Sequence, residues 1–231
     1  MSGTFISKSA LYRGADSSQL GQISSGIAHK RREAILQVTS EGIVGDAQVD
    51  TRHHGGPDRA VHHFPREHYG EYRRRDMFRG FVDAPAMGEN VSTVGLTEET
   101  LHIGDILSFG STVLQVSQPR SPCFKLDLRF AYPGFALVMQ TLGKSGWFYR
   151  VLEPGEITET DTLKLKERLS DISVANAMCW YFAAEFTETN YRRLLACPGL
   201  AQSWRNSLEK RLASGKIEDW RPRLMGPGSP A

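Results

Sequence analysis

The middle of the chain carries the stretch around which the rest is organised, residues 116–126, which read Val-Ser-Gln-Pro-Arg-Ser-Pro-Cys-Phe-Lys-Leu. An alternating run over 112–116 predicts a strand that leads directly into it. Pro119 and Pro122 then stiffen the backbone, because each proline locks its own φ and holds the residue before it extended. We therefore expect Cys123 to be presented from a rigid turn at the end of a strand.

Cys123 is a candidate for chemistry because cations flank it. Arg120 and Lys125 lie within three residues of the thiol. Nearby positive charge favours the thiolate, which is both the nucleophile and the metal ligand of cysteine chemistry. The alternative is that Cys123 is a small buried hydrophobe, as most free cysteines are. The functional interpretation requires its sulfur to be exposed in a positively lined hollow, beside the histidine–glycine turn described below.

Composition narrows the class of protein. A chain of 231 residues can form one large domain, or one domain with a small appendix. With 40% hydrophobic and 23% charged residues and a net charge of +2, nothing indicates a nucleic-acid polymer or an anionic membrane as partner. The three cysteines are widely spaced, which favours a reducing compartment. There is no signal-peptide pattern and no apolar run near the ~18 residues of a membrane helix, so we expect a cytoplasmic protein.

The first two-thirds of the chain predict a β-rich domain. Strands are expected over 4–9, 34–39, 60–64, 87–93, 106–109 and 112–116, the last two as a hairpin, and a final hairpin is expected from 147–151 and 162–166 across a turn at 153–156. A loop is expected over 14–26, a helix from Pro65 to Arg75 with Arg73 to Arg75 on its solvated face, and a helix over 134–142 capped by Gly143. About eight short strands with few helices favour a closed or partly closed barrel.

The hydrophobic period changes from two to 3.6 near Arg168. Helices are expected around Val174 to Tyr181, around Tyr191 to Leu195, and from Leu200 to Leu212 with Gly215 as the cap. The predicted domains are a β-barrel over 1–168, a three-helix extension over 169–224 and a disordered tail over 225–231. Cys179 and Cys197 fall in the extension, where we interpret both as packing residues.

A second candidate region spans residues 52–63 and holds four histidines. A histidine metal site is disfavoured, because adjacent histidines on an extended chain point to opposite faces and no second cluster offers the remaining ligands. Gly55 and Gly56 lie between Arg52 and Arg59, and bare amides beside arginines form a nest suited to phosphate. The alternative is a glycine turn with surface arginines.

Taken together, these motifs resemble a known family. The segments 54–61, 88–92, 104–105 and 117–123 are similar to the MOSC domain, a family linked to molybdenum-cofactor sulfurases. The segments 203–204 and 214–219 resemble the three-helix extension of its YiiM-type branch. The resemblance covers about residues 3 to 225. It implies a mainly β fold with α, a MOSC-type closed or partly closed β-barrel with a small C-terminal three-helix appendix.

The resemblance also implies a cofactor and the residues that bind it. The cofactor would be the molybdenum cofactor (Mo-molybdopterin), with Cys123 as the thiolate ligand of the metal. Its phosphate would be bound by cationic and backbone donors, for which the candidates are Arg120, His54, Gly55, Gly56 and Arg59. Ser121 and Asn90 are candidate hydrogen-bond partners of the pterin or of an oxygen on the metal. The family further implies pyridoxal phosphate binding.

The activity implied by the resemblance is reduction of N-hydroxylated compounds, such as hydroxylaminopurine-like bases, as detoxification. His54 is the candidate general acid. Since no nicotinamide or flavin fingerprint is evident, electrons are expected from a separate reductase, for which the basic face at Arg73 to Arg75 is a possible docking patch. Two alternatives stay open: a sulfur carrier that holds a persulfide on Cys123, and a module that binds or delivers the cofactor. The sequence leaves an oligomer possible.

Overall fold

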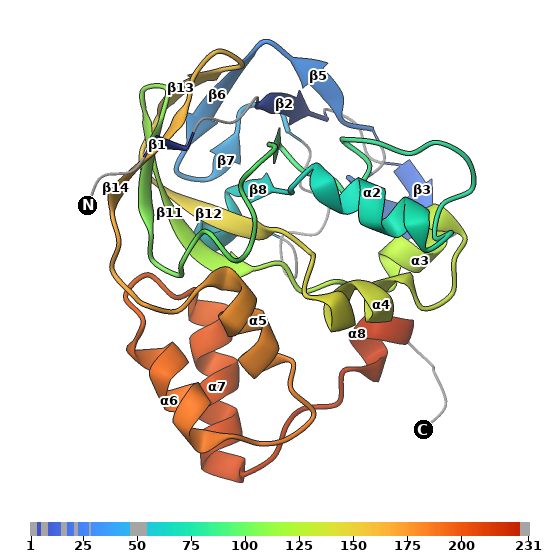
Figure 1. Ribbon diagram of the computed structural model, residues 1–231, viewed down its shortest axis with the longest axis vertical. Helices are drawn as coiled ribbons and strands as arrows, with labels where there is room; N and C mark the ends of the chain where they lie inside the picture. The colour runs from blue at the N-terminus through green and yellow to red at the C-terminus, as the bar shows by residue number, and fades with distance from the viewer. Residues whose placement is uncertain are drawn as a thin grey trace.

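The largest element of the fold is a nine-stranded sheet that curls into a half-barrel (Figure 1). The computed structural model describes residues 4–5, 9–14, 18–20, 23–27, 29–46 and 55–226. The strand order is β1 (Thr4–Phe5), β14 (Leu163–Glu167), β10 (Ile106–Phe109), β11 (Thr112–Pro119), β12 (Trp147–Glu153), β8 (Val61–His63), β9 (Val91–Ser92), β2 (Ala10–Arg13) and β5 (Arg31–Glu33). Neighbouring strands are antiparallel except β8 and β9, which are parallel. The partly closed barrel that the strand pattern predicts is confirmed.

Strand β11 lies inside this sheet, between β10 and β12, and it carries the chain to Cys123. It forms the predicted hairpin with β10, in which Phe109 pairs with Thr112. The strand continues to Pro119, beyond the expected end at residue 116, because β12 pairs with it as far as Pro119, opposite Trp147. All eight residues of β11 are buried.

The final hairpin predicted from 147–151 and 162–166 is wrong. Strand β12 lies between β11 and β8, whereas β14 lies between β10 and β1. The chain after β12 instead enters β13 (Gly155–Thr158), which pairs with β6 (Ile35–Thr39) in a small sheet completed by β7 (Gly42–Ile43). The turn residues at 153–156 do specify a sharp bend, but they carry no information about which distant strands the chain pairs with afterwards.

The N-terminal region also differs from expectation. Strand β1 covers only Thr4–Phe5 of the strand expected over 4–9 and pairs with β14; residues 6–8 lie outside the described part of the chain, and Ser9 is not in a strand. Strand β2 begins at Ala10 and lies between β9 and β5. The expected loop over 14–26 contains a short hairpin of β3 (Ser18–Leu20) and β4 (Ile23–Ser25). Three-residue polar strands lack the alternating apolar pattern that would reveal them.

Four short helices gather at one end of the sheet, and the first three of them share a second hydrophobic core (Figure 1). They are α2 (Glu67–Arg74), α3 (Lys125–Phe130), α4 (Phe135–Leu142) and α8 (Arg221–Met225). Helices α2 and α4 confirm the predictions, and Gly143 caps α4 in the left-handed region at φ 63. Helices α3 and α8 were not predicted. In this core Phe130 and Phe135 stack with ring centroids 4.6 Å apart, which fixes α3 against α4.

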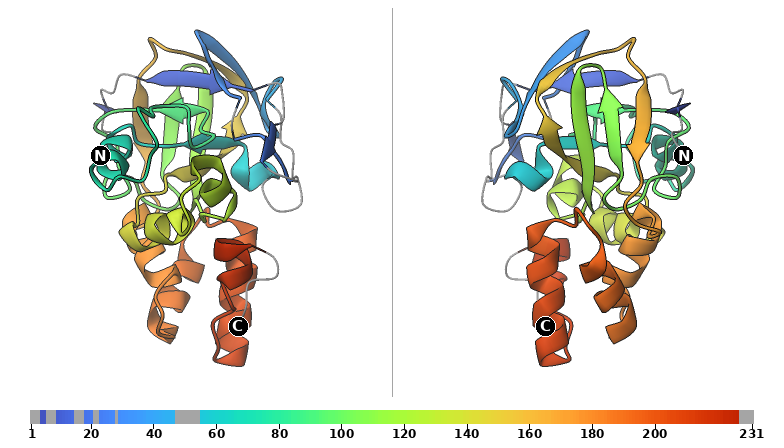
Figure 2. Two further views of the ribbon diagram at one scale, coloured as in Figure 1. Left: turned by 90° about the vertical axis from the view of Figure 1, so that its right-hand side faces the viewer. Right: turned by 90° about the vertical axis from the view of Figure 1, so that its left-hand side faces the viewer.

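The predicted C-terminal helices are present below the sheet (Figure 2). They are α5 (Val174–Tyr181), α6 (Glu188–Ala196) and α7 (Gln202–Ser214), with Gly215 capping α7 at φ 67. Tyr181 and Trp204 stack at 3.9 Å between α5 and α7. Cys197 is buried as expected, but Cys179 is exposed, so its interpretation as a packing residue is wrong. Cys179 falls outside the stripe of buried α5 residues at 174, 177, 178 and 181.

Two further points concern the ends of the chain and its helices. The predicted tail over 225–231 begins inside α8, and residues 227–231 lie outside the described part of the chain. Among the helices described, none has both the length and the apolar character that crossing a membrane requires.

Candidate functional site

The segment that bears Cys123 is fixed mainly through its backbone. After β11 ends at Pro119, the Arg120 amide donates to the Gly146 carbonyl at 3.0 Å, and the Ser145 hydroxyl donates to the Arg120 carbonyl at 2.7 Å. The Cys123 carbonyl accepts from the Leu126 amide at 3.0 Å, as α3 begins. The turn is therefore bonded to the two residues just before β12 on one side and to the start of α3 on the other.

The expectation of an exposed sulfur at Cys123 is wrong. Only 8% of the residue is accessible to solvent. The reason is that α8, which the sequence did not reveal, packs against this turn: the Arg223 side chain bonds the Pro122 carbonyl, and the Phe124 amide donates to the Arg223 carbonyl at 2.9 Å. Burial of the sulfur came from an element more than ninety residues away in sequence.

The positive lining expected around Cys123 is present. Arg120 is 7% exposed, and its guanidinium interacts electrostatically with Cys123 and with Glu89. Burial lowers the pKa of Arg120 from its ordinary value, which these negative groups oppose. The Glu89 carboxyl group is also buried, and burial raises its pKa. It accepts a hydrogen bond from the Tyr69 hydroxyl at 2.6 Å. Cys123 therefore lies in a buried polar site with a cation beside it.

Two buried polar atoms in this site lack partners among the described residues, Arg120 Nη1 and His62 Nε2. His62 lies on β8 and is 6% exposed. Burial and the positive charge of Arg120 hold the pKa of His62 well below its ordinary value, against a hydrogen bond to the Gly88 backbone. Unpaired buried polar atoms are uncommon in native proteins and call for a bound group or water. Arg120 Nη1 therefore fits an anionic or hydrogen-bond-accepting group, whereas Nε2 of the neutral His62, whose other ring nitrogen donates to the Gly88 backbone, is an acceptor and fits a donor on the same group.

A buried ion pair lies at the N-terminal side of the same site. Lys30 Nζ is 2.7 Å from Asp46 Oδ2, with side chains 6% and 8% exposed. The Asn90 amide nitrogen donates to the same Asp46 oxygen at 2.9 Å, and Asn90 Oδ1 accepts from the His62 amide at 3.1 Å. Burial lowers the pKa of Lys30, and Asp46 opposes this; Arg120 is also within electrostatic range. Asn90, a predicted cofactor ligand, therefore connects this pair to β8.

The histidine–glycine turn leads to the end of β11. His53 and His54 lie outside the described residues, so the roles predicted for His54 stay predictions. Gly55 is half-buried, and Gly56 is exposed at φ 98 with open space where a side chain would start. This backbone leaves room for a ligand to approach.

The turn continues into a short 3₁₀ helix, η1 (Pro57–Arg59), that packs on β11. Arg59 Nε donates to Gln118 Oε1 at 3.4 Å, and the Ser117 hydroxyl donates to the Asp58 carbonyl at 2.5 Å. The turn and the Cys123 segment are thus attached to the same strand end. Ser121, another predicted ligand, is half-buried in the segment itself.

Three site residues were missed by sequence reasoning: Lys30, His62 and Arg223. His62 was counted only as a member of the histidine cluster, and its neighbour His63 points to different partners, Tyr149 and Thr93, at 3.0 and 2.8 Å. No local pattern marks Lys30 or Arg223, which reach the site only through the fold. In the described part of the chain, no set of three or more His, Cys, Asp or Glu side chains is arranged to hold a metal ion.

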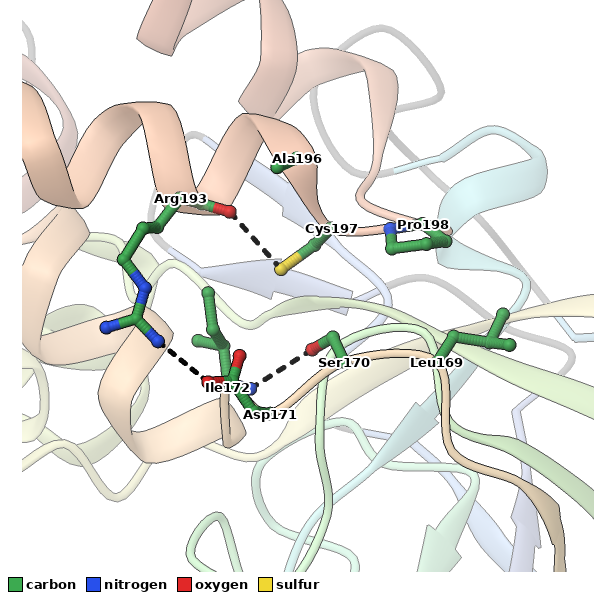
Figure 3. A pocket seen from close by; sticks show the side chains of 8 residues that line it. All are labelled: Leu169, Ser170, Asp171, Ile172, Arg193, Ala196, Cys197 and Pro198. Carbon is green, nitrogen blue, oxygen red and sulfur yellow. Dashed lines mark hydrogen bonds and ion pairs between the residues drawn. The ribbon is translucent and has the colours of Figure 1, made fainter.

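A separate cavity lies in the helical extension (Figure 3). It has a volume of about 290 Å³ and is bounded by the connection from β14 to α5 and by the end of α6. Its polar groups are already paired: Arg193 bonds Asp171 at 2.9 Å, and the Cys197 thiol contacts the Arg193 carbonyl at 3.6 Å. Burial raises the pKa of Cys197, which disfavours its thiolate. The cavity therefore offers no reactive group.

Comparison with known proteins identifies the family. The MOSC domain model matches residues 50–164, and the model of the YiiM-like three-α-helix domain matches residues 172–215. Protein YiiM of Escherichia coli is 45% identical over 204 residues, which cover 87% of this chain and 91% of that protein. The chain belongs to the YiiM-like MOSC-domain family.

Relatives and solved structures agree with this assignment. The protein YflK of Bacillus subtilis is 35% identical over 82% of this chain and 86% of its own. The crystal structure of Escherichia coli YiiM superposes with a TM-score of 0.78 at 38% identity, over 94% of this chain and 98% of that one. A crystal structure described as a hypothetical protein superposes with a TM-score of 0.84 at 40% identity, over 97% of both chains.

One relative has a name that describes an activity. A protein named "Reductase" from Gibberella moniliformis is 37% identical over 150 residues, which are 64% of this chain and 27% of that protein. MOSC domains are associated with binding of the molybdenum cofactor, and membership of this family therefore suggests a cofactor-binding protein. Neither the family matches nor the relatives' names support pyridoxal phosphate binding.

Proposed function

We propose that this protein is a molybdenum-cofactor-dependent reductase of N-hydroxylated compounds, with hydroxylaminopurine-like bases as the substrate class and their detoxification as its role. The observation that carries the proposal is the pair of unpartnered buried polar atoms, Arg120 Nη1 and His62 Nε2, beside Cys123 in a chain of the MOSC family. A soft thiolate suits a molybdenum centre, and buried cationic donors suit a phosphate-bearing pterin.

The predicted residues in the described part of the chain would divide the binding of the cofactor between them. Cys123 would bind the metal, and Arg120 with the backbone at Gly55 and Gly56 would bind the anionic part of the cofactor. Arg59 and Ser121 lie at the same end of β11 and would complete the contacts to the pterin. When bound, the cofactor supplies the two-electron chemistry that breaks an N–O bond.

The protein's own groups would position this chemistry and keep water out. Cys123, Arg120 and His62 are all less than 9% exposed, so charges in the site are poorly screened. His62 stays neutral near pH 7 because its pKa is lowered, and it therefore serves as a hydrogen-bond partner and not as a proton source. The general acid that the departing oxygen needs remains assigned to His54.

Electrons would come from a separate reductase. The proposed docking face is the end of α2, where Arg74 and Arg75 are exposed, and both bond Glu71 at 2.7 and 2.8 Å. Because Glu71 offsets part of the charge of Arg74 and Arg75, an acidic partner would be attracted by the positive charge that Glu71 leaves unbalanced. The affinity for this partner should depend strongly on salt concentration. We place the protein in the cytoplasm, consistent with its free cysteines.

Metal analysis and turnover test the proposal together. Protein purified anaerobically is expected to hold roughly one molybdenum per chain, and with reduced viologen as donor to convert hydroxylaminopurine to the amine. Cys123→Ala should lose both, whereas Cys179→Ala, a change at an exposed cysteine, should keep both. Molybdenum without turnover would favour the delivery module, and a persulfide on Cys123 without molybdenum would favour the sulfur carrier. Full metal content and activity in Cys123→Ala would refute the ligand role.

A further inference from the structure

The C-terminal helix α8 contacts the site although it lies outside both family matches. Those matches end at residues 164 and 215, whereas α8 spans Arg221–Met225. After the three-helix extension, the chain returns to the barrel side and α8 lies beside α4 (Figure 1). Leu224 is buried in this packing. From the sequence, residues 221–224 were predicted to end the helical extension and residue 225 to begin a disordered tail.

Arg223 of α8 is bonded to the segment that bears Cys123. One guanidinium nitrogen donates to the Pro122 carbonyl, and the other donates to Gln140 Oε1 of α4 at 2.7 Å. The Arg223 carbonyl accepts from the Phe124 amide at 2.9 Å. The residues immediately before and after Cys123 are thus both bonded to one residue of α8.

A close approach after α8 seals the same position. Gly226, at φ 93, lies against the ring of Phe124, and a Cβ there would be 3.3 Å from Phe124 Cδ2. This distance leaves little room for a side chain at Gly226, so the chain passes tightly over the residue that follows Cys123. The segment after α8 therefore packs directly on the residue that follows Cys123.

Helix α8 is also anchored to the helical extension. Glu218, just before α8, bonds the buried guanidinium of Arg211 on α7 at 2.6 and 2.7 Å. The Trp220 ring lies edge-on to Phe182 at 5.8 Å, and the Arg223 guanidinium lies 5.2 Å from the centroid of the same Phe182 ring. The extension and the Cys123 segment are consequently joined through one short helix.

We infer that Arg223 is a positioning residue for Cys123, and that α8 acts as a clamp through which the helical extension closes the cofactor site. The inference rests on the proposed function only in taking Cys123 as the metal ligand. The clamp itself is a property of the metal-free chain, because its contacts are to the backbone at Pro122 and Phe124. The extension therefore serves the site as well as the stability of the fold.

The test is the rate at which N-ethylmaleimide alkylates each cysteine of the metal-free protein, followed by peptide mass spectrometry. In the unmodified protein Cys123 should react slowly and the exposed Cys179 quickly. Arg223→Met should raise the Cys123 rate by about tenfold or more, since charge-assisted hydrogen bonds that oppose local opening are lost. Arg221→Met changes an exposed arginine of the same helix that pairs with Asp219, and it should leave the rate unchanged.

Two further variants protect the test. Arg223→Lys keeps a donor within reach of Pro122 and should restore part of the slow reaction. Gln140→Met removes one acceptor of the Arg223 guanidinium while leaving α8 intact, and it should raise the alkylation rate of Cys123 by a smaller factor. This variant provides the test if Arg223→Met does not fold. Loss of a nearby cation by itself would slow alkylation, because it disfavours the thiolate, so a faster reaction reports access.

The inference is overturned if folded Arg223→Met alkylates Cys123 at the rate of the unmodified protein. It is equally overturned if the buried Cys197 accelerates in parallel, because the variant would then loosen the whole chain. Absence of molybdenum from the unmodified protein would count against the proposed function but would leave this result intact.

Discussion

The buried pair of Lys30 and Asp46 gives a prediction whose size follows from its surroundings. The two charged atoms are 2.7 Å apart, and both side chains are less than a tenth exposed. Lys30→Met removes the cation with little change in volume and leaves the Asp46 carboxylate buried without its counter-charge. Removing one partner of a buried pair costs roughly 3–5 kcal/mol.

Two other donors reduce this value. Asp46 keeps the Gly14 amide at 2.8 Å and the Asn90 amide nitrogen at 2.9 Å. We therefore expect Lys30→Met to lower the free energy of unfolding by about 3 kcal/mol, at the low end of that range. Asn90 also accepts a hydrogen bond from the His62 amide on β8. The same substitution should therefore loosen the position of Asn90 and of His62 in the site.

Urea unfolding at pH 7 measures the effect, and a double-mutant cycle tests its cause. Lys30→Met with Asp46→Asn removes both charges and should recover most of the loss, to within about 1 kcal/mol of the unmodified protein. Arg32→Met is the control, since its pair with Glu159 has an arginine side chain 67% exposed and its loss should leave the unfolding midpoint nearly unchanged. The reasoning fails if Lys30→Met unfolds at the unmodified midpoint, or if the double variant is no more stable than the single one.

Three further predictions concern stability. Burial lowers the pKa of His63 from 6.5 to about 3, so between these pH values the imidazole is protonated in the unfolded chain but not in the folded one. The free energy of unfolding should therefore fall by about 4 kcal/mol as the pH drops from 6.5 to 3. His63→Phe should reduce this dependence on pH, as measured by urea titrations at several pH values. Gly104 has φ 86, and a Cβ there would clash with the Pro198 carbonyl, so Gly104→Ala should lower the free energy of unfolding by about 3 kcal/mol or more. Gly95 has a similar φ of 88 but faces open space, so Gly95→Ala should lower it by about 1 kcal/mol. Equal losses for the two variants in thermal unfolding would contradict the role of the clash. Trp204→Ala should cost about 3–5 kcal/mol, since only 2% of this residue is exposed, and a loss below about 1 kcal/mol by calorimetry would show that α7 is dispensable to the core.

Local chemistry made parts of the fold predictable. The hairpin of β10 and β11, the glycine caps at Gly143 and Gly215, and the apolar stripe of α5 are set by residues within one or two turns of each other. Prediction failed where partners are distant: β12 and β14 were expected to pair with each other, and each pairs elsewhere. Turn residues fix where a chain bends, while pairing depends on which apolar faces the whole fold must cover.

The candidate site divides in the same way. Cys123 and Arg120 are close in sequence, so a thiol beside a cation was foreseeable, and the structure confirms that the two interact. The degree of exposure was not foreseeable, because it depends on Arg223 from the far end of the chain. His62 likewise became a site residue only when β8 lined up beside β12 in the curled sheet.

The sequence by itself determined the identity of the thiol, its neighbouring cation, the proline-stiffened turn and the period of most helices, since these follow from bonds and side chains a few residues apart. The tertiary structure alone decided that the thiol is buried, that Lys30 meets Asp46, and that α8 bonds both residues that flank the thiol. The physical reason is that burial and charge pairing depend on distances through space between distant segments, and only the folded chain fixes those distances.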